Sequence, residues 1–361
     1  MPIAYLLFEM QMNVIGFNVN DRLLPLCLET VAVILSVKKH THTSTSSPFP
    51  LLAQSEAVPE KGSVSIWFGH VELHAALKNA SNTNWNMMTC VVFNELKVPL
   101  VGLTTWAGDP NVEQTVREAL KAGCRYFKCS ERSDFGRVGE ALKAAMEEGL
   151  VTREDLRVAG ELNDVTVVDV ESHLRDALFS LQLDYFDIYM LRFSAEMKMT
   201  TVIELWKKLE ILFSSAKGLV KVPGVSNTSI YKVSALCSAA NIHPFVCEAE
   251  MHPLFPQTEL LDYCREKQIH CIACAPFAAG EITEPYSHQR LSREKNLLKH
   301  EAVLAVAIAL NKTPAQVLVR WALQRGTSVL LPTINHDRLR ENLDVFDWEL
   351  SAEQVESLNH I

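Results

Sequence analysis

Charged side chains lie near the ends of three apolar segments of this chain, where they are placed to do chemistry. Lys128 and Glu161 each lie close to the end of such a segment, and Arg192 ends a third. A lysine whose pKa is lowered by a neighbouring cation can serve as a nucleophile, whereas a lysine beside a carboxylate forms a buried ion pair. The ion pair is favoured, because a buried charge that has lost its partner costs roughly 3–5 kcal/mol, and a lysine and a glutamate that face each other avoid that cost.

Cysteine and histidine residues offer a second kind of chemistry. Cys271 and Cys274 have the spacing of a metal-binding pair and follow His270. Successive residues of a strand point to opposite faces, so His270 and Cys274 share a face that Cys271 does not, and the three cannot bind one metal. The nine cysteines are scattered and odd in number. We expect reduced core thiols in a cytoplasmic protein, with no metal site.

The overall charge and the N-terminal composition disfavour two classes of partner. The net charge is −9 and the pI is near 5.8, whereas nucleic-acid-binding surfaces are normally basic. The apolar segment from Met1 to Val37 is interrupted by charged and polar residues, so no run reaches the roughly 20 apolar residues of a membrane span. A basic segment that would start a signal peptide is also missing.

The chain changes character near residue 90. Residues 1–89 are expected to form a largely irregular extension, and residues 90–361 a single domain in which short apolar runs alternate with amphipathic segments. The predicted strands are Val98–Thr105, Cys124–Ser130, Leu156–Leu162, Phe186–Arg192, Leu219–Ser226, Phe245–Met251, Ile269–Pro276 and Thr327–Thr333. The predicted helices are Asn111–Ala122, Arg137–Glu148, Val167–Leu181, Thr201–Ala216, Ile230–Ala240, Gln257–Lys267, Asn296–Leu310 and Pro314–Gln324.

This alternation predicts an α/β fold of one particular kind. Eight strand–helix alternations in succession favour a (β/α)8 TIM barrel. A doubly wound open sheet is the alternative, but no G-x-G-x-x-G follows the first predicted strand. The apolar run Val91–Phe93, ahead of the first predicted strand, is expected to form a strand pair that closes the bottom of the barrel.

Several strings of residues, in a fixed order, resemble the aldo-keto reductase family. The most specific is Gly218–Lys221 followed by Gly224–Asn227. The others are Val98–Trp106, Gly123–Cys129, Leu181–Leu191, His252-Pro253, Lys312–Leu318 and Arg338–Asn342. The resemblance covers about 260 residues and implies a barrel whose active site lies at the carboxyl ends of the strands.

The resemblance also implies a catalytic Asp, Tyr, Lys and His, and this chain has other residues at all four positions. The matching residues are Lys128, Ser133 (or Arg132), Glu161 and Arg192. A serine does not replace the tyrosine as a general acid, because the pKa of its hydroxyl lies several units higher. Tyr126 lies on the same strand face as Lys128 but deeper. Arg192 is expected either to bind an anion with Lys128 or, preferably, to fold onto Glu161 as a bidentate partner.

The cofactor site implied by the resemblance, for NADP or NAD, is half retained. Its candidate residues are Thr105, Trp106, Ser226, Asn227, Glu248, Cys274, Arg338 and Asn342. Ser226 and Asn227 match the pair that holds the nicotinamide carboxamide, but Glu248 replaces a glutamine and Cys274 replaces the tyrosine that stacks on the ring. Arg338 and Asn342 match the residues that meet the adenosine end. The expectation is weak or absent dinucleotide binding.

Three functions remain open. The first is a non-catalytic binding or regulatory scaffold, a pseudoenzyme with a dinucleotide, a small carbonyl compound or a protein as partner. It is favoured by the replaced catalytic residues, by the short connection after Arg192 and by the lack of a covering tail after the last helix. The second is an NAD(P)H-dependent oxidoreductase that reduces aldehydes or ketones with a re-sited proton donor. The third is an enzyme of new chemistry that uses Lys128 as its nucleophile.

Overall fold

The computed structural model describes residues 90–93, 96–105, 109–129, 134–163, 166–194, 197–278, 296–332 and 336–361. The chain divides into two units, Met1–Ile66 and Trp67–Ile361, and every described residue belongs to the second. The expected irregular extension, together with Trp106, Arg132 and Ser133, lies outside the described residues.

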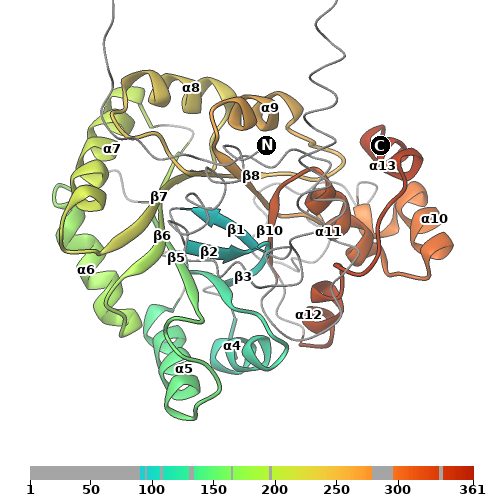
Figure 1. Ribbon diagram of the computed structural model, residues 1–361, viewed down its shortest axis with the longest axis horizontal. Helices are drawn as coiled ribbons and strands as arrows, with labels where there is room; N and C mark the ends of the chain where they lie inside the picture. Colours follow the sequence, from blue (N-terminus) through green and yellow to red (C-terminus); the bar gives the residue numbers. More distant parts are fainter. Residues whose placement is uncertain are drawn as a thin grey trace, which may run out of the picture. The chain divides into compact units, whose positions relative to one another are not determined.

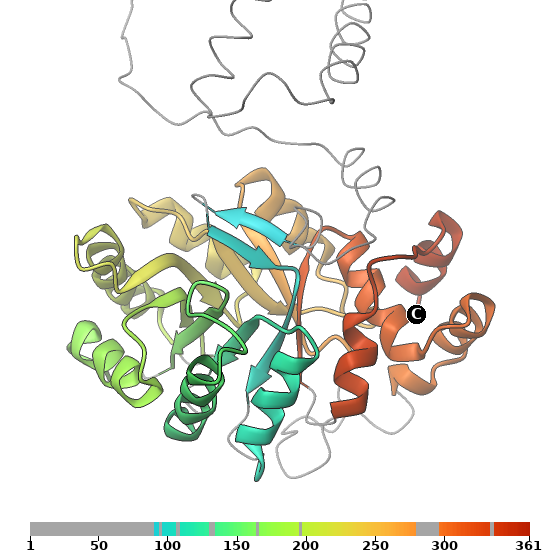
Figure 2. The same ribbon diagram turned by 60° about the horizontal axis from the view of Figure 1, so that its bottom comes forward.

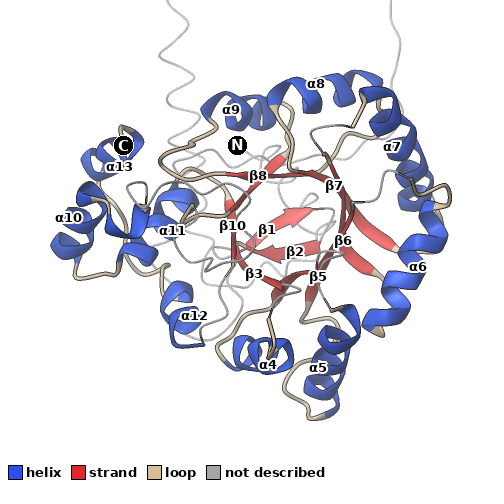
Figure 3. Cartoon of the chain, turned by 180° about the vertical axis from the view of Figure 1, so that it is seen from behind, coloured by secondary structure: helices blue, strands red, loops and turns tan. Residues whose placement is uncertain are grey.

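Eight parallel strands close into a barrel, as the alternation predicted, and the open-sheet alternative is wrong (Figures 1 and 3). The hydrogen-bonded order around the barrel is β10-β3-β4-β5-β6-β7-β8-β9. The strands are β3 (Val101–Thr105), β4 (Tyr126–Cys129), β5 (Arg157–Leu162), β6 (Phe186–Arg192), β7 (Val220–Ser226), β8 (Val246–Glu250), β9 (His270–Cys274) and β10 (Ser328–Leu331). Closure leaves none of these strands with an unpaired edge.

The helices lie outside the strands. They are α4 (Val112–Lys121), α5 (Phe135–Glu147), α6 (Val170–Leu181), α7 (Met199–Ser214), α8 (Ile230–Ala239), α9 (Thr258–Glu266), α10 (Glu301–Leu310), α11 (Pro314–Gln324), α12 (His336–Leu343) and α13 (Ala352–Asn359), with a short 3-10 helix η4 (Leu297–Lys299) before α10. The sequence predicted α4 to α11 and missed α12 and α13. Among the described residues no single helix could span a membrane, and α10 with α11 reach that length and hydropathy only as a pair bent by 92°.

Capping residues set where several helices begin. The Thr313 hydroxyl accepts a hydrogen bond from the Gln316 backbone N–H, and the Gln316 side chain accepts one from the Thr313 backbone N–H. Pro314 occupies the first turn of α11. This capping box satisfies backbone donors that a helix start leaves open. The predicted helix Asn296–Leu310 is instead interrupted at His300, whose side chain accepts from the Ala302 amide and caps α10.

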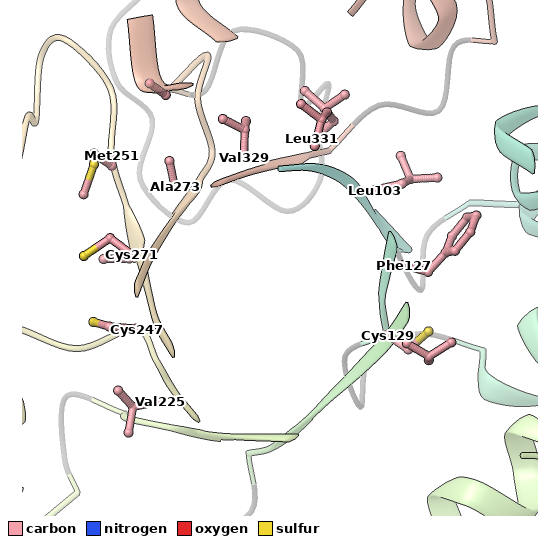
Figure 4. Packing of buried hydrophobic residues seen from close by; sticks show 14 of the residues in the cluster. Leu103, Phe127, Cys129, Val225, Cys247, Met251, Cys271, Ala273, Val329 and Leu331 are labelled. Carbon is pink, nitrogen blue, oxygen red and sulfur yellow. The ribbon is translucent and has the colours of Figure 1, made fainter. Parts of the chain in front are cut away.

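Side chains on the outer face of the barrel strands form the main core with the helices. Figure 4 shows Leu103, Phe127 and Val329 pointing away from the centre of the ring. Cys247 and Cys271, which are register partners on β8 and β9, point outward with them. Cys271 therefore faces the helices. The expected reduced thiols are also found, because the eight cysteines in the described part are all free.

A small hairpin covers one end of the barrel. Strands β1 (Cys90–Phe93) and β2 (Leu96–Pro99) pair antiparallel, and Figure 2 shows them lying across the strands. Phe93 and Val98 are buried against inward-facing barrel residues that include Tyr126 and Ile188. The expected plug is confirmed. The predicted strand Val98–Thr105 is divided at Leu100, where the chain passes from β2 into β3.

Candidate functional site

The inward-facing residues at the carboxyl ends of β4 to β8 are polar or charged. Lys128, Glu161, Arg192, Ser226 and Glu248 each lie near the end of one of these five consecutive strands. In the sheet register Arg192 pairs with Ser226, and Ser226 with Glu248. Because side chains alternate along a strand, the inward direction of Tyr126 and Ile188 below sets the same direction for Lys128 and Arg192.

Lys128 bridges two buried carboxylates. Its Nζ lies 2.6 Å from Glu248 Oε1 and 3.0 Å from Glu161 Oε2. All three residues are buried: Lys128 is 4% exposed, Glu161 3% and Glu248 2%. Burial by itself lowers the pKa of Lys128, but Glu248 and Glu161 outweigh it and raise the pKa well above its usual value. The nucleophile hypothesis is therefore wrong, since it required a lowered pKa. The expected ion pair with Glu161 is present.

Glu161 lies at the centre of the polar cluster. Its carboxylate accepts hydrogen bonds from Ser226 Oγ at 3.2 Å and from Asn163 Nδ2 at 3.4 Å, in addition to its contact with Lys128. Burial works to raise the pKa of Glu161, but Lys128 and Arg192 hold it below its usual range. Glu161 is thus an ionised acceptor, and it has no proton to give to a substrate near neutral pH.

Arg192 is placed differently from what we expected. One of its nitrogens, Nη1, lies 3.8 Å from Glu161 Oε2, and 40% of the side chain is exposed. This single long contact is not the bidentate pair that would close the site. The charge balance also changes, because Glu248 joins Glu161. Two cations, Lys128 and Arg192, now face two carboxylates. The cluster therefore has no excess positive charge that would attract an anion.

Tyr126 lies below this cluster, in the barrel interior. It is fully buried, and its hydroxyl has no hydrogen-bond partner. Burial, together with the charges of Glu248 and Asp187, raises its pKa well above 10. The expectation that Tyr126 lies deeper than Lys128 is confirmed. A phenol in this position offers neither the access nor the acidity that protonation of a carbonyl oxygen requires.

The residues that the resemblance implied for the nicotinamide end of a cofactor lie at the ends of β7 and β9. Ser226 is fully buried and donates to Glu161. Asn227 has a positive φ of 55°, and its Nδ2 donates to the Phe193 carbonyl at 2.6 Å. Cys274 ends β9, and burial raises the pKa of its thiol, so that it stays neutral. These side chains are engaged with the protein or lack an aromatic surface.

The adenosine-end candidates lie on α12. Asn342 is 0% exposed, and neither its Nδ2 nor its Oδ1 has a hydrogen-bond partner. An unpaired buried amide costs about 1–3 kcal/mol. Arg338, one helical turn earlier, is exposed. Thr105, at the end of β3, donates to the Lys128 carbonyl at 3.3 Å, which ties the β3 end to the charged cluster.

Comparisons with known proteins decide the family. The model of the Aldo/keto reductase family matches residues 101–361. Mouse aldo-keto reductase family 1 member A1 is 34% identical over 287 residues, which cover 73% of this chain and 86% of the mouse protein. The chain belongs to the aldo-keto reductase family.

Other family members span a similar part of the chain. The NADPH-dependent D-xylose reductase of Meyerozyma guilliermondii is 31% identical, with coverage of 76% of this chain and 94% of that protein. The solved structure of the aldose reductase from Schistosoma japonicum superimposes with a TM-score of 0.64 at 28% identity, covering 74% of this chain and 89% of that one. These likenesses support the barrel independently of its sequence pattern.

A nicotinamide dinucleotide, the cofactor of this family, fits the two ends of its site unequally. The unpaired donor and acceptor of the Asn342 amide match the N6 and N7 edge of adenine, which asparagine recognises through these two groups. The nicotinamide end does not fit: Ser226 and Asn227 already bond to the protein, and Cys274 offers no ring for stacking. Arg338 and Asn342 are therefore the residues that would hold the cofactor.

Sequence reasoning missed the role of Glu248 in the charged cluster. It was assigned to the cofactor site, whereas its carboxylate makes the shortest contact of Lys128. The structure pairs Glu248 with Ser226 on neighbouring strands, a register that the sequence does not show. The pairing of Lys128 with Glu248 also depends on which side chains from opposite strands reach each other inside the barrel, which the linear pattern does not encode.

Proposed function

We propose that this aldo-keto reductase family member does not reduce carbonyl compounds by the route of its family, and that it acts as a binding or regulatory protein whose ligand is an adenine dinucleotide. The observation that carries the proposal is the position of Lys128 Nζ, 3.0 Å from Glu161 and 2.6 Å from Glu248. Two of the positions that resemble the family's catalytic residues, Lys128 and Glu161, are thus occupied by buried charges that neutralise one another.

The missing chemistry is proton transfer. Hydride, which a bound nicotinamide cofactor supplies, makes a carbonyl oxygen alkoxide-like, and an acid near that oxygen must protonate it. In the described part of the mouth Lys128 directs its protons at two carboxylates, and Tyr126 is fully buried beneath it. Loss of general acid catalysis alone removes roughly 10²–10⁴-fold in rate.

The ligand part of the proposal follows from the unequal fit. Asn342 and Arg338 favour the adenosine end, and the nicotinamide end contributes little, so binding is expected to be weak. It is expected to be similar for NADPH and NADH, because Thr333 stands where the resemblance implies a lysine that holds the 2′-phosphate. The free thiols of the described cysteines support a reducing, cytoplasmic location. A protein partner is a further part of the proposal, as for other non-catalytic members of known folds.

An active reductase is the second candidate, and the relatives favour it. They include an NADPH-dependent D-xylose reductase at 31% identity. In that case the most accessible cation of the mouth, Arg192, would orient the substrate, and the Lys128 ammonium would have to leave one carboxylate to donate its proton. Lys128→Met would then abolish turnover, whereas under the main proposal no turnover exists to be lost.

Consumption of NADPH and NADH with 4-nitrobenzaldehyde tests the two candidates. We expect no rate above that without protein. Turnover on the order of 1 s⁻¹, within the usual enzyme range, would establish the reductase instead. Binding is measured in parallel by quenching of nicotinamide fluorescence. A sub-micromolar Kd for NADPH that weakens tenfold or more for NADH, about 1.4 kcal/mol, would contradict the expected lack of preference.

A further inference from the structure

A pocket lies on the outer side of the barrel, away from the charged cluster. It has a volume of about 400 Å³ and is formed by α9, the end of α11, and α13, which lie near one another in Figure 1. Arg265 on α9 and Arg325 just after α11 are both among its lining residues. The mechanism and the cofactor site use neither arginine.

Arg325 is a partly buried cation without a carboxylate partner. Its Nη1 donates to the Pro256 carbonyl at 2.7 Å, and its guanidinium carbon lies 4.5 Å from the centre of the Trp321 ring. No carboxylate in the described part of the chain comes within ion-pair distance of it. Burial lowers the pKa of Arg325; the charge of Asp262 opposes this in part, and the charge of Arg265 adds to it to a smaller extent. Arginine stays charged nonetheless, so this charge is held at a cost that a bound anion would relieve.

Arg265 is the second cation of the pocket, and it can be released. It contacts Asp262 at 2.6 Å, three residues earlier on the same helix, and the two side chains are 41% and 61% exposed. Exposed pairs of this kind contribute little, so an anion can replace Asp262 as the partner. Two guanidinium groups facing one cavity match the geometry of a phosphate or a carboxylate, which each can contact through two N–H groups.

The rest of the lining limits the kind of ligand. Leu261 contributes an apolar wall, and the hydroxyl of Thr258 accepts a hydrogen bond from Arg325 Nη2 at 3.4 Å. Glu356 on α13 is exposed at the rim and disfavours ligands of high negative charge. A volume of about 400 Å³ falls in the range of small-molecule sites, so the ligand has a body as well as an anionic group.

We propose that this pocket binds a small molecule that carries one phosphate or carboxylate group, held between Arg265 and Arg325 with its body against Leu261. Such a site is separate from the barrel mouth and adds a second ligand to the protein. In the competing explanation Arg325 only ties α11 to the segment before α9, since a cation is favourable at a helix carboxyl end.

The test is a titration of the full chain with inorganic phosphate, and separately with acetate, at constant ionic strength, followed by thermal unfolding and calorimetry. We expect a saturable rise in Tm with at least one of the two anions. Arg265→Gln should weaken the apparent affinity at least fivefold. Arg117→Gln, which removes an exposed arginine that pairs with Glu148 elsewhere on the surface, should leave it unchanged.

Arg325→Gln is a second variant that removes the other proposed anion contact. If Arg325→Gln loses stability on its own, the comparison between Arg265→Gln and Arg117→Gln still stands. A phosphate effect alone identifies a phosphate ligand, and an acetate effect alone a carboxylate. The proposal is wrong if neither anion gives a saturable effect, or if the effect survives Arg265→Gln, which would place the anion at the barrel mouth or at scattered surface sites.

Discussion

Lys128 contacts two carboxylates within the barrel, so each of the three charges depends on the others for compensation. The Lys128–Glu161 and Lys128–Glu248 contacts are short, and all three side chains are nearly inaccessible to water. Compensation of this kind keeps a barrel folded after its original mouth residues have changed, although a well-packed apolar cluster could be equally stable. The cluster fits the proposed function, in which the charges at the barrel mouth stabilise the fold and take no part in proton transfer.

Replacement of Lys128 by methionine should destabilise the protein strongly. The change leaves Glu248 without its close cation and Glu161 with only the distant Arg192, at an expected cost of roughly 3–5 kcal/mol. Urea unfolding monitored by fluorescence measures it. The double variant Lys128→Met/Glu248→Gln should recover part of the loss, because one of the two uncompensated charges is gone. Strictly additive effects would show that the two side chains do not depend on each other.

The pKa of Glu161 predicts how stability changes at low pH. The folded-state pKa is lowered below the ordinary value of 4.5, so the contribution of Glu161 is fully present above about pH 4.5 and is lost as the pH falls through the folded-state value. The difference in unfolding free energy between the natural chain and Glu161→Gln should therefore shrink below that pH. A difference that stays constant from pH 6 to pH 3 would contradict the assigned ionisation.

At the scale of elements, His270 and Ser328 join β9 to β10 near the plugged end of the barrel. His270 Nε2 lies 2.7 Å from Ser328 Oγ and also accepts from the Ser328 amide at 3.2 Å, which places the remaining proton of the neutral ring on Nδ1. The ring lies edge-on to Phe93 of the plug, with centroids 5.8 Å apart. The hairpin, the two strands and the neutral histidine thus form one packed unit.

Because His270 is part of this packed unit, we expect the stability of the protein to fall in mild acid. Burial lowers the pKa of His270 from 6.5 to about 4, so between these values the unfolded chain binds more protons than the folded one, and stability falls as the pH falls. The loss of stability approaches about 2–3 kcal/mol at pH 4. This is somewhat less than the full pKa difference corresponds to, because the ring keeps some contact with solvent. His270→Gln, which keeps an amide for Ser328 but does not titrate, should lack this part of the pH dependence in urea unfolding measured from pH 7 to pH 4.

At the scale of the whole molecule, the barrel is closed and its lower end is covered by residues of the same region. The hairpin β1–β2 starts at Cys90, and the core clusters are built from residues 93–358. Every barrel strand has two neighbours, so no edge of this sheet depends on another segment for pairing. We therefore propose residue 90 as the start of a self-sufficient domain.

A chain of residues 90–361 should fold cooperatively. Its Tm should lie within a few degrees of that of the full chain, because the plug and all the barrel strands are retained. Circular dichroism during heating measures this, with a chain that begins at Leu96, and so lacks β1, as the control expected to lose Phe93 and to melt at lower temperature. A truncated chain that fails to unfold in a single transition would move the boundary toward the N-terminus.

The sequence by itself determined the order and type of the elements. The period of apolar residues is a local property, so the strand runs and the helices from α4 to α11 were readable along the chain, as was the depth of Tyr126. Helices α12 and α13 were missed because short helices with few buried residues give a weak periodic signal. Leu100, where one predicted strand became two, marks a change of direction that periodicity does not report.

Only the tertiary structure decided which further charge joins the predicted pair of Lys128 and Glu161. Glu161 was recognised from strand order, because its strand neighbours that of Lys128. Glu248 lies 120 residues from Lys128, and it reaches the ammonium only because closure of the barrel brings β8 opposite β4. Likewise, the exposure of Arg192 depends on the space around it. Local patterns fix the direction of a side chain along its own strand, but the partner across the barrel is set by closure.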